Sequence, residues 1–209
     1  MIYLDHNATT PVDPAVAEKM AWFLREHFGN PSSLYPLGRR VKELMNEARE
    51  RLAGALGVDR GEVYFTGSGT ESDNLAVFGT LEAAAGKDEF VTSAIEHPAV
   101  LEAGKALEAR GVKVTYLPVD ERGTVSLDHL RSALTPKTGL VSIMHANNEI
   151  GTIQPVAEIV RIAHERGVPV HTDAVQTFGK IDVDARKLGV DFLTVSAHKI
   201  YGPKGVGAL

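Results

Sequence analysis

The sequence predicts an α/β fold in which helices lie on both sides of a mainly parallel, seven-stranded sheet. From Glu62 onward, short runs of β-branched and other apolar residues mostly alternate with helix-like segments. These runs are too apolar for strands with one face in water, and strands buried on both faces are typical of parallel sheets. With 209 residues, 44% hydrophobic and 23% charged, the chain can bury a core of this kind.

An arm and two helices are expected to precede the α/β region. Asp13 is a favourable N-cap for an amphipathic helix over 15–28, and a second helix over 38–56 ends at Gly57, a favourable C-cap. We therefore divide the chain into an extended N-terminal arm (1–13), a helical segment (14–58) and an α/β domain (59–209).

The expected strands of the α/β domain lie at 63–65, 89–94, 112–117, 140–144, 168–171, 192–195 and 206–209. The helices between them are expected at 71–85, 98–110, 126–134, 154–166 and 184–188. The last residues begin a strand pattern without a turn or cap, so we expect that further polypeptide, on this gene or another chain, normally follows and that the last strand is truncated.

The composition excludes several classes of protein. The chain carries 22 Lys and Arg against 27 Asp and Glu, a net charge of −5, without a basic stripe, so binding to nucleic acid is not expected. No apolar run approaches the ~18 residues of a membrane span, and the N-terminus lacks a secretory pattern, which favours the cytoplasm. The chain contains no Cys, which excludes disulfides, thiolate metal sites and a cysteine nucleophile of its own.

Polar residues follow five of the expected strands. In open α/β sheets, ligands bind outside the carboxyl ends of the strands, so these residues are expected to meet at one edge. The five segments are Thr66–Ser72, Ile95–Pro98, His145–Glu149, Thr172–Gln176 and Ser196–Lys199.

The first of these segments is a candidate phosphate cradle. Its glycine-containing turn precedes a helix, so backbone N–H groups and the hydroxyls of Ser68, Thr70 and Ser72 could bind a phosphate. The segment is neither a Walker loop nor a dinucleotide fingerprint. Taken alone, it is more often a plain N-cap with an acidic residue in the first turn, and that alternative stays open.

The other segments contribute ionisable groups. Each of these groups also has a structural alternative. Asp173 could be a cap or form a surface salt bridge, Lys199 could be an ordinary solvated lysine, and His97 and His198 could be structural histidines. The remaining histidines show no metal-ligand spacing, so no metal site is expected. A phosphate cradle, a carboxylate, a flat imidazole, an amide pair and a lysine on one sheet edge are together the groups needed to hold pyridoxal 5′-phosphate.

Long, ordered motifs strengthen this interpretation. The chain resembles the cysteine desulfurases, in the class V aminotransferase group of fold-type I pyridoxal-phosphate enzymes, from Tyr3 to its last residue. The matching segments are Tyr3–Pro11, Phe28–Ser33, Phe65–Asn74, His145–Pro155 and Ser196–Gly205. The resemblance implies the large, cofactor-binding domain of that fold, with the arm belonging to the side of a small domain.

The resemblance also implies roles for individual residues. Lys199 would bind the cofactor covalently and later move the substrate α-proton, Asp173 would keep the pyridine nitrogen protonated, and His97 would stack on the ring and assist proton transfer. The groups expected to hold the ring are Asn148 and Gln176, and those expected to hold the phosphate are Gly69, Thr70, Ser196 and His198. The Asn30–Ser33 segment would lie near the substrate entrance.

Two features depart from the family pattern. Tyr35 stands where many relatives carry a His. The persulfide-forming cysteine, the arginine that binds the substrate carboxylate and most of the small domain would follow the lysine motif, and none is in this sequence. We therefore expect the cofactor-binding portion of a cysteine desulfurase, which converts L-cysteine to L-alanine and an enzyme persulfide for iron–sulfur cluster synthesis or tRNA thiolation, with this chain inactive alone.

The resemblance suggests partners as well. We expect a homodimer, a sulfur-acceptor or iron–sulfur scaffold protein, and a separate chain that carries the C-terminal part. The alternatives are a related class V lyase or aminotransferase that needs no cysteine, and a non-catalytic scaffold that has kept the cofactor pocket.

Overall fold

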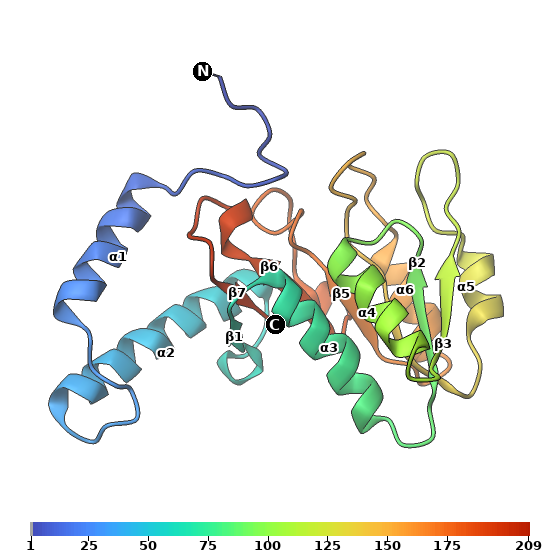
Figure 1. Ribbon diagram of the computed structural model, residues 1–209, viewed down its shortest axis with the longest axis horizontal. Helices are drawn as coiled ribbons and strands as arrows, with labels where there is room; N and C mark the ends of the chain where they lie inside the picture. Colours follow the sequence, from blue (N-terminus) through green and yellow to red (C-terminus); the bar gives the residue numbers. More distant parts are fainter. Residues whose placement is uncertain (1) are drawn as a thin grey trace.

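The computed structural model describes residues 2–209 and has one sheet with the strand order β1-β7-β6-β5-β4-β2-β3 (Figure 1). Strands β2 to β6 run parallel to one another, whereas β7 is antiparallel to both β6 and β1. The strands are β1 (Phe65–Thr66), β2 (Glu89–Ser93), β3 (Lys113–Leu117), β4 (Thr138–Ser142), β5 (Val170–Asp173), β6 (Phe192–Ser196) and β7 (Gly207–Ala208). The expected mainly parallel, seven-stranded sheet is confirmed.

The helices connect and cover these strands. They are α1 (Pro14–Glu26), α2 (Pro36–Leu56), α3 (Gly69–Ala83), α4 (Pro98–Glu108), α5 (Leu127–Ala133), α6 (Val156–His164) and α7 (Ala185–Leu188), with short 3₁₀ turns at Arg60–Glu62 and Ala197–Lys199. Every expected strand and helix is present, although each differs by one or two residues at one or both ends.

The helix ends follow local chemistry. The Asp13 side chain accepts the N–H of Ala15 at 2.8 Å, and Gly57 ends α2 with φ = 72°, as expected. Two of the boundary differences lie in the N-terminal helices. Helix α1 ends at Glu26 rather than residue 28, because His27 leaves helical geometry at φ = −126°. Helix α2 begins two residues early, at Pro36, because proline is compatible with the first turn of a helix.

The core lies on both faces of the sheet. Phe90 and Leu140 pack with α3 and α4 on one face, whereas the next residues along, Val91 and Val141, pack with α5 and α6 on the other. This alternation follows from the opposite directions of successive side chains in a strand. It explains why β2 and β4, which are covered by helices on both faces, are buried along their whole length.

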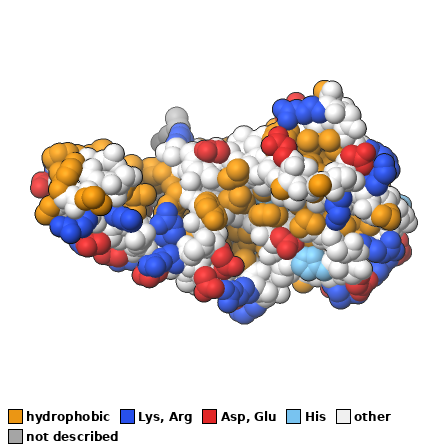
Figure 2. All heavy atoms as spheres, turned by 90° about the horizontal axis from the view of Figure 1, so that it is seen from below, with side chains coloured by type: hydrophobic (Ala, Val, Ile, Leu, Met, Phe, Trp, Pro, Cys, Tyr) orange, Lys and Arg blue, Asp and Glu red, His pale blue; other side chains and the backbone are white. Residues whose placement is uncertain are grey.

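The N-terminal helices extend away from the sheet (Figure 1). Helix α1 buries none of its residues, and Leu24, Phe28 and Leu34 are largely exposed in this region. Figure 2 shows hydrophobic side chains gathered at the end of the molecule formed by α1 and α2. Within residues 2–209, the helices are all too short or too polar to span a membrane.

Candidate active site

A cavity of about 200 Å³ lies at the carboxyl edge of the sheet. Its lining residues come from the arm, the start of α3 and the segments that follow β2, β4, β5 and β6; they are Ala8, Ser68, Gly69, Thr70, Asp73, His97, Met144, Asn148, Asp173, Val175, Gln176, Ser196, His198 and Lys199. All the residues expected to bind a cofactor therefore line one cavity. Two larger hollows, of about 510 and 700 Å³, border Phe192 and Leu209 and lack this convergence of polar groups.

Lys199 lies in the short turn that follows β6 and faces the N-terminal arm. Its Nζ donates hydrogen bonds to the carbonyl oxygens of Asn7 and Ala8, the latter at 3.0 Å. Partial burial lowers the pKa of the Lys199 amine, and the nearby Lys180 ammonium lowers it further. The lysine is therefore not a freely solvated side chain, and its amine loses its proton more readily than that of an ordinary lysine.

The arm is bound to the loop that carries this lysine. The Thr10 N–H donates to the carbonyl of His198 at 2.8 Å, and the Asp13 N–H donates to the carbonyl of Tyr201 at 2.9 Å. The Thr9 hydroxyl lies 3.1 Å from Nδ1 of His198. Two segments almost 190 residues apart in sequence thus form one wall of the cavity.

Asp173 ends β5 and is only 7% exposed. Its Oδ1 accepts the N–H of Val175 at 2.8 Å. Burial raises the pKa of the carboxyl, while that N–H, His97 and Lys199 oppose the shift. The surface salt-bridge alternative for Asp173 is therefore wrong, although the side chain does cap the turn that follows the strand.

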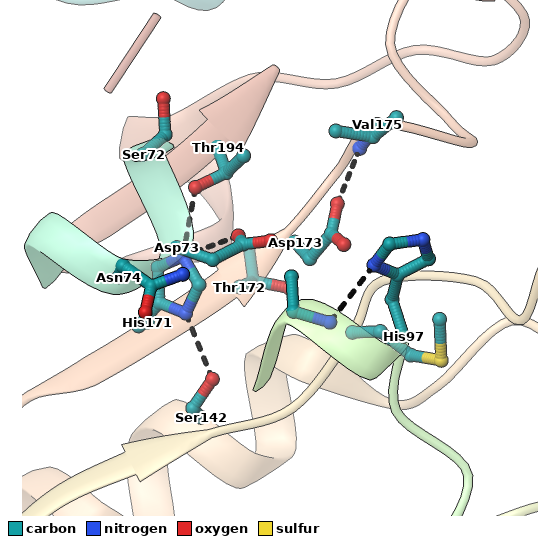
Figure 3. Close-up of polar contacts among 12 residues, drawn as sticks. Ser72, Asp73, Asn74, His97, Ser142, His171, Thr172, Asp173, Val175 and Thr194 are labelled. Atoms are coloured by element: carbon teal, nitrogen blue, oxygen red, sulfur yellow. Dashed lines mark hydrogen bonds and ion pairs between the residues drawn. The ribbon is translucent and has the colours of Figure 1, made fainter. Parts of the chain in front are cut away.

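His97 lies at the start of α4, where it caps the helix. Its Nδ1 accepts the N–H of Ala99 at 3.1 Å, so the ring proton is on Nε2 (Figure 3). The ring is thereby fixed in orientation beside the cavity, with an N–H donor left over.

The turn expected to form a phosphate cradle lies in the cavity wall, where Ser68, Gly69 and Thr70 line the cavity. The Ser68 Oγ accepts the N–H of Glu71 at 3.1 Å, so this hydroxyl serves as the N-cap of α3, in line with the alternative left open above. Ser72 is fully buried, with its hydroxyl 2.8 Å from that of Thr66. The expectation that the Ser72 hydroxyl faces a phosphate is wrong, because the helix turns this position inward.

The N-terminal turn of α3 still offers donors. The first N–H groups of a helix have no partner inside it, and those of Gly69 and Thr70 belong to this turn. A Cβ on Gly69 would come within 3.1 Å of Val175 Cγ2, so the absent side chain allows the helix start to pack closely against the loop after β5. Ser196 and His198 line the same cavity, and a Cβ on Gly69 would lie 3.5 Å from the Cβ of Ser196.

The two amide residues are held by the arm. Gln176 donates through Nε2 to the carbonyl of Asn7 at 3.0 Å and accepts from Lys180 Nζ at 2.9 Å. The backbone carbonyl of Asn148 accepts from Asn7 Nδ2 at 3.1 Å, and the side-chain amide of Asn148 donates to Glu149 Oε1 at 2.9 Å. The Gln176 amide is therefore oriented by residues outside the five polar segments, whereas the Asn148 amide is held within its own segment.

Sequence reasoning missed several residues of the cavity. Ala8, Asp73, Met144 and Val175 line it without having been singled out. Asp73 is the chemically important omission, because it is 1% exposed and yet carries a carboxyl group. The signal available in the sequence was its position one turn into α3, three and four residues before Ala76 and Val77, which are apolar and buried.

The groups present fit pyridoxal 5′-phosphate. A buried carboxylate for a pyridinium nitrogen, a fixed imidazole, a lysine with a lowered pKa and free helix N–H groups for a phosphate all face one small cavity. A metal centre fits less well, because residues 2–209 contain no group of three or more His, Cys, Asp or Glu side chains with suitable placement.

Known proteins resemble the chain over its whole length. It is 53% identical over 209 residues to a protein named cysteine desulfurase IscS from Dictyoglomus turgidum, and 51% identical to one of that name from Methanosarcina thermophila. Each alignment covers 100% of this chain but only 53% and 52% of the relative. The chain thus spans about half the length of the curated relatives it matches.

Solved structures share the fold. A NifS-like protein superposes with a TM-score of 0.95 at 47% identity, over 99% of this chain and 57% of its own. SspA in complex with cysteine superposes with a TM-score of 0.94 at 40% identity, and the match covers 100% of this chain and 60% of the SspA chain. These matches confirm the expected large-domain fold. Residues 2–209 also match the family described as aminotransferase class-V, and the chain therefore belongs to the class-V aminotransferases.

Proposed function

We propose that this chain is the pyridoxal-phosphate-binding portion of a cysteine desulfurase. The observation that carries the proposal is the convergence of Lys199, Asp173 and His97 on one cavity at the carboxyl edge of the sheet. Members of the family use pyridoxal 5′-phosphate. The names of the relatives, and the cysteine bound by SspA, support L-cysteine as the substrate.

In this proposal each residue acts through a property described above. When bound, the cofactor supplies an electron sink for the charge that develops at the substrate α-carbon. The lowered pKa of Lys199 suits its amine for moving the α-proton. The carboxylate of Asp173 favours a protonated pyridine nitrogen, because a nearby anion raises the pKa of that nitrogen. His97 presents its Nε2 proton to the cavity as a donor.

The remaining contacts position the cofactor. The N–H groups at Gly69 and Thr70, with Ser196 and His198, bind the phosphate through the positive end of α3. Asn148 and Gln176 fix the ring edge; the Gln176 amide is oriented by the Asn7 carbonyl, and the Asn148 backbone carbonyl is held by the Asn7 side chain. The arm thus belongs to the binding site as well as to its surroundings.

The sulfur-accepting step needs a thiol that these 209 residues do not contain. We propose that a cysteine on further polypeptide attacks the substrate sulfur, so that the carbon–sulfur bond breaks, alanine leaves and the thiol becomes a persulfide. The persulfide would serve iron–sulfur cluster synthesis or tRNA thiolation through an acceptor protein. Self-association into a homodimer and the division into arm, helical segment and α/β domain belong to the same proposal.

Trapping with borohydride tests the assignment of the lysine. After incubation with pyridoxal 5′-phosphate and reduction, peptide mapping is expected to find the label on Lys199, and the Lys199→Ala variant is expected to lose it. Lys187→Ala, on the exposed side of α7, is the matched control and should label like the unmodified chain. Equal labelling of Lys199→Ala, spread over other lysines, would contradict the proposal.

A further inference from the structure

A buried polar cluster surrounds Asp173 at the cavity, and the proposed chemistry assigns no part to its other members. Figure 3 shows Asp73, from α3, beside His171 and Asp173, both from β5. Asp73 and His171 are 1% and 0% exposed. A carboxyl group buried this completely is costly if it is ionised without a cation, so its charge state needs an explanation.

The imidazole of His171 is held by hydroxyl groups on the neighbouring strands. Its Nδ1 lies 2.8 Å from the Ser142 Oγ of β4, and its Nε2 lies 3.0 Å from the Thr194 Oγ1 of β6. Hydroxyls can act as donor or acceptor, so a neutral imidazole satisfies both contacts. Complete burial lowers the pKa of His171 to about 3, which agrees with a neutral ring.

Asp73 has no cation of its own. Its Oδ1 lies 3.6 Å from Nε2 of His171, beyond hydrogen-bond distance, and has no hydrogen-bond partner among the described residues. The ionisable groups that face it are His171 and Asp173 from β5 and Glu96 from the loop after β2, two of which are acids. Burial and these two acids raise its pKa, and only the Thr194 hydroxyl opposes the shift.

Asp173 is placed differently, although it belongs to the same cluster. It receives the N–H of Val175, and His97 and Lys199 face it from the cavity side. Glu96 receives the Ser93 hydroxyl at 2.5 Å and the N–H of Met144 at 3.0 Å. When carboxyl groups share one buried site, they do not all ionise, and the charge stays where the donors and cations are.

We propose that Asp73 is a positioning residue that stays protonated and neutral at the cavity, so that Asp173 carries the negative charge of this acidic cluster. A second anion at Asp73 would compete with Asp173 for the single negative charge of the buried cluster and would push a proton onto Asp173. The neutral carboxyl avoids this competition and packs against His171 without a desolvated charge. The use of the Asp173 charge to stabilise a pyridinium nitrogen rests on the proposed function. The protonation of Asp73 does not depend on that function.

Infrared difference spectroscopy on the cofactor-free chain at pH 7 tests the charge state. The Asp73→Asn variant is expected to lose a carbonyl band of a protonated carboxyl group, whereas Asp173→Asn is expected to lose carboxylate bands. Asp128→Asn, at an exposed position on α5, is the matched control and should also lose carboxylate bands, since an exposed aspartate is ionised at this pH.

A positioning role also predicts the effect of Asp73→Asn on its neighbour. Because a neutral group is replaced by a neutral group, the pH at which Asp173 takes up a proton should be unchanged. Loss of carboxylate bands in Asp73→Asn, or a lower protonation pH for Asp173, would overturn the proposal and indicate an ion pair of Asp73 with a protonated His171.

A measurement without substitution covers the case in which the variant does not fold. In the unmodified chain labelled with carboxyl-¹³C aspartate, one buried carboxyl signal is expected at its protonated position at pH 7, and its absence would overturn the proposal. Both experiments omit pyridoxal 5′-phosphate, so a negative result in either one does not contradict the proposed function. A negative result in the borohydride test, in turn, does not contradict the protonation of Asp73.

Discussion

At the scale of single residues, the molecule concentrates buried acids at the carboxyl edge of its sheet. Asp73, Asp173 and Glu96 are 1%, 7% and 4% exposed, and burial raises the pKa of each. Asp73 and Glu96 therefore hold protons in the folded chain that the unfolded chain releases, whereas His97 and Lys199 oppose the pKa shift at Asp173. The site is therefore built at a cost in stability that grows as the pH rises.

For Glu96, the pH dependence of this stability cost can be measured. Burial raises its pKa from an ordinary value of 4.5 to about 8, so its contribution to stability is present below about pH 4.5 and is lost as the pH rises to about 8. Between these values, one such group lowers the free energy of unfolding by about 1.4 kcal/mol per pH unit. Urea unfolding of Glu96→Gln at several pH values is expected to show a shallower decline than the unmodified chain.

The control for this prediction is Glu158→Gln, at an exposed position in the first turn of α6. Its free energy of unfolding should fall with pH as steeply as that of the unmodified chain across the same pH range. An unchanged slope in Glu96→Gln would mean that Glu96 is ionised in the folded protein, held by the Ser93 hydroxyl and the Met144 N–H.

At the scale of elements, the end of α2 and the start of α7 meet at one glycine. Gly57 has φ = 72°, and a Cβ there would lie 2.6 Å from Oδ1 of Asp184. That oxygen caps α7 by accepting the N–H of Lys187 at 2.9 Å. Because α7 leads into β6, and the short turn after β6 carries Lys199, this contact supports the placement of the site.

Gly57→Ala is therefore expected to destabilise the chain through two effects. Left-handed backbone at a non-glycine residue costs about 1 kcal/mol, and displacement of the Asp184 cap costs about 1 kcal/mol more. Gly111→Ala is the matched control, since Gly111 has φ = 86° but open space where a Cβ would lie. Equal losses of unfolding free energy in urea for the two variants would contradict the role given to Asp184.

At the scale of the whole molecule, the fold brings the arm back over the cavity while α1 stays unburied. Asn7 and Ala8 contact Lys199, yet the helix that follows them packs little against the sheet (Figure 1). The cavity is thus assembled from both ends of the chain. Its chemistry nevertheless lacks a thiol, since the chain contains no Cys.

This absence predicts the activity of the chain. With pyridoxal 5′-phosphate and L-cysteine, the 209-residue chain is expected to release no sulfide above the level given by the free cofactor, because no thiol is placed to attack the substrate sulfur. Addition of a polypeptide that carries the rest of the relatives' length, including a cysteine, should restore alanine production. Alanine formation in proportion to the pure chain would contradict the desulfurase proposal and favour a lyase.

The sequence by itself determined the class of fold and the edge on which the polar residues meet. Apolar runs that alternate with helical segments define the strands, and parallel strands bring their carboxyl ends to one edge, so Lys199, Asp173 and His97 could be grouped without coordinates. Boundaries shifted by a few residues, as at Pro36, because local capping and proline geometry decide helix ends and hydrophobic periodicity does not.

The tertiary structure alone decided which polar groups face the cavity and which are buried against the sheet. Ser72 and Asp73 follow the cradle as consecutive polar residues, yet the turn of α3 buries both against the sheet, where one contacts Thr66 and the other lies near His171. The contact of the arm with Lys199 is likewise invisible in local sequence. Such contacts depend on how distant segments pack and on the cost of buried charge, which no local pattern of residues encodes.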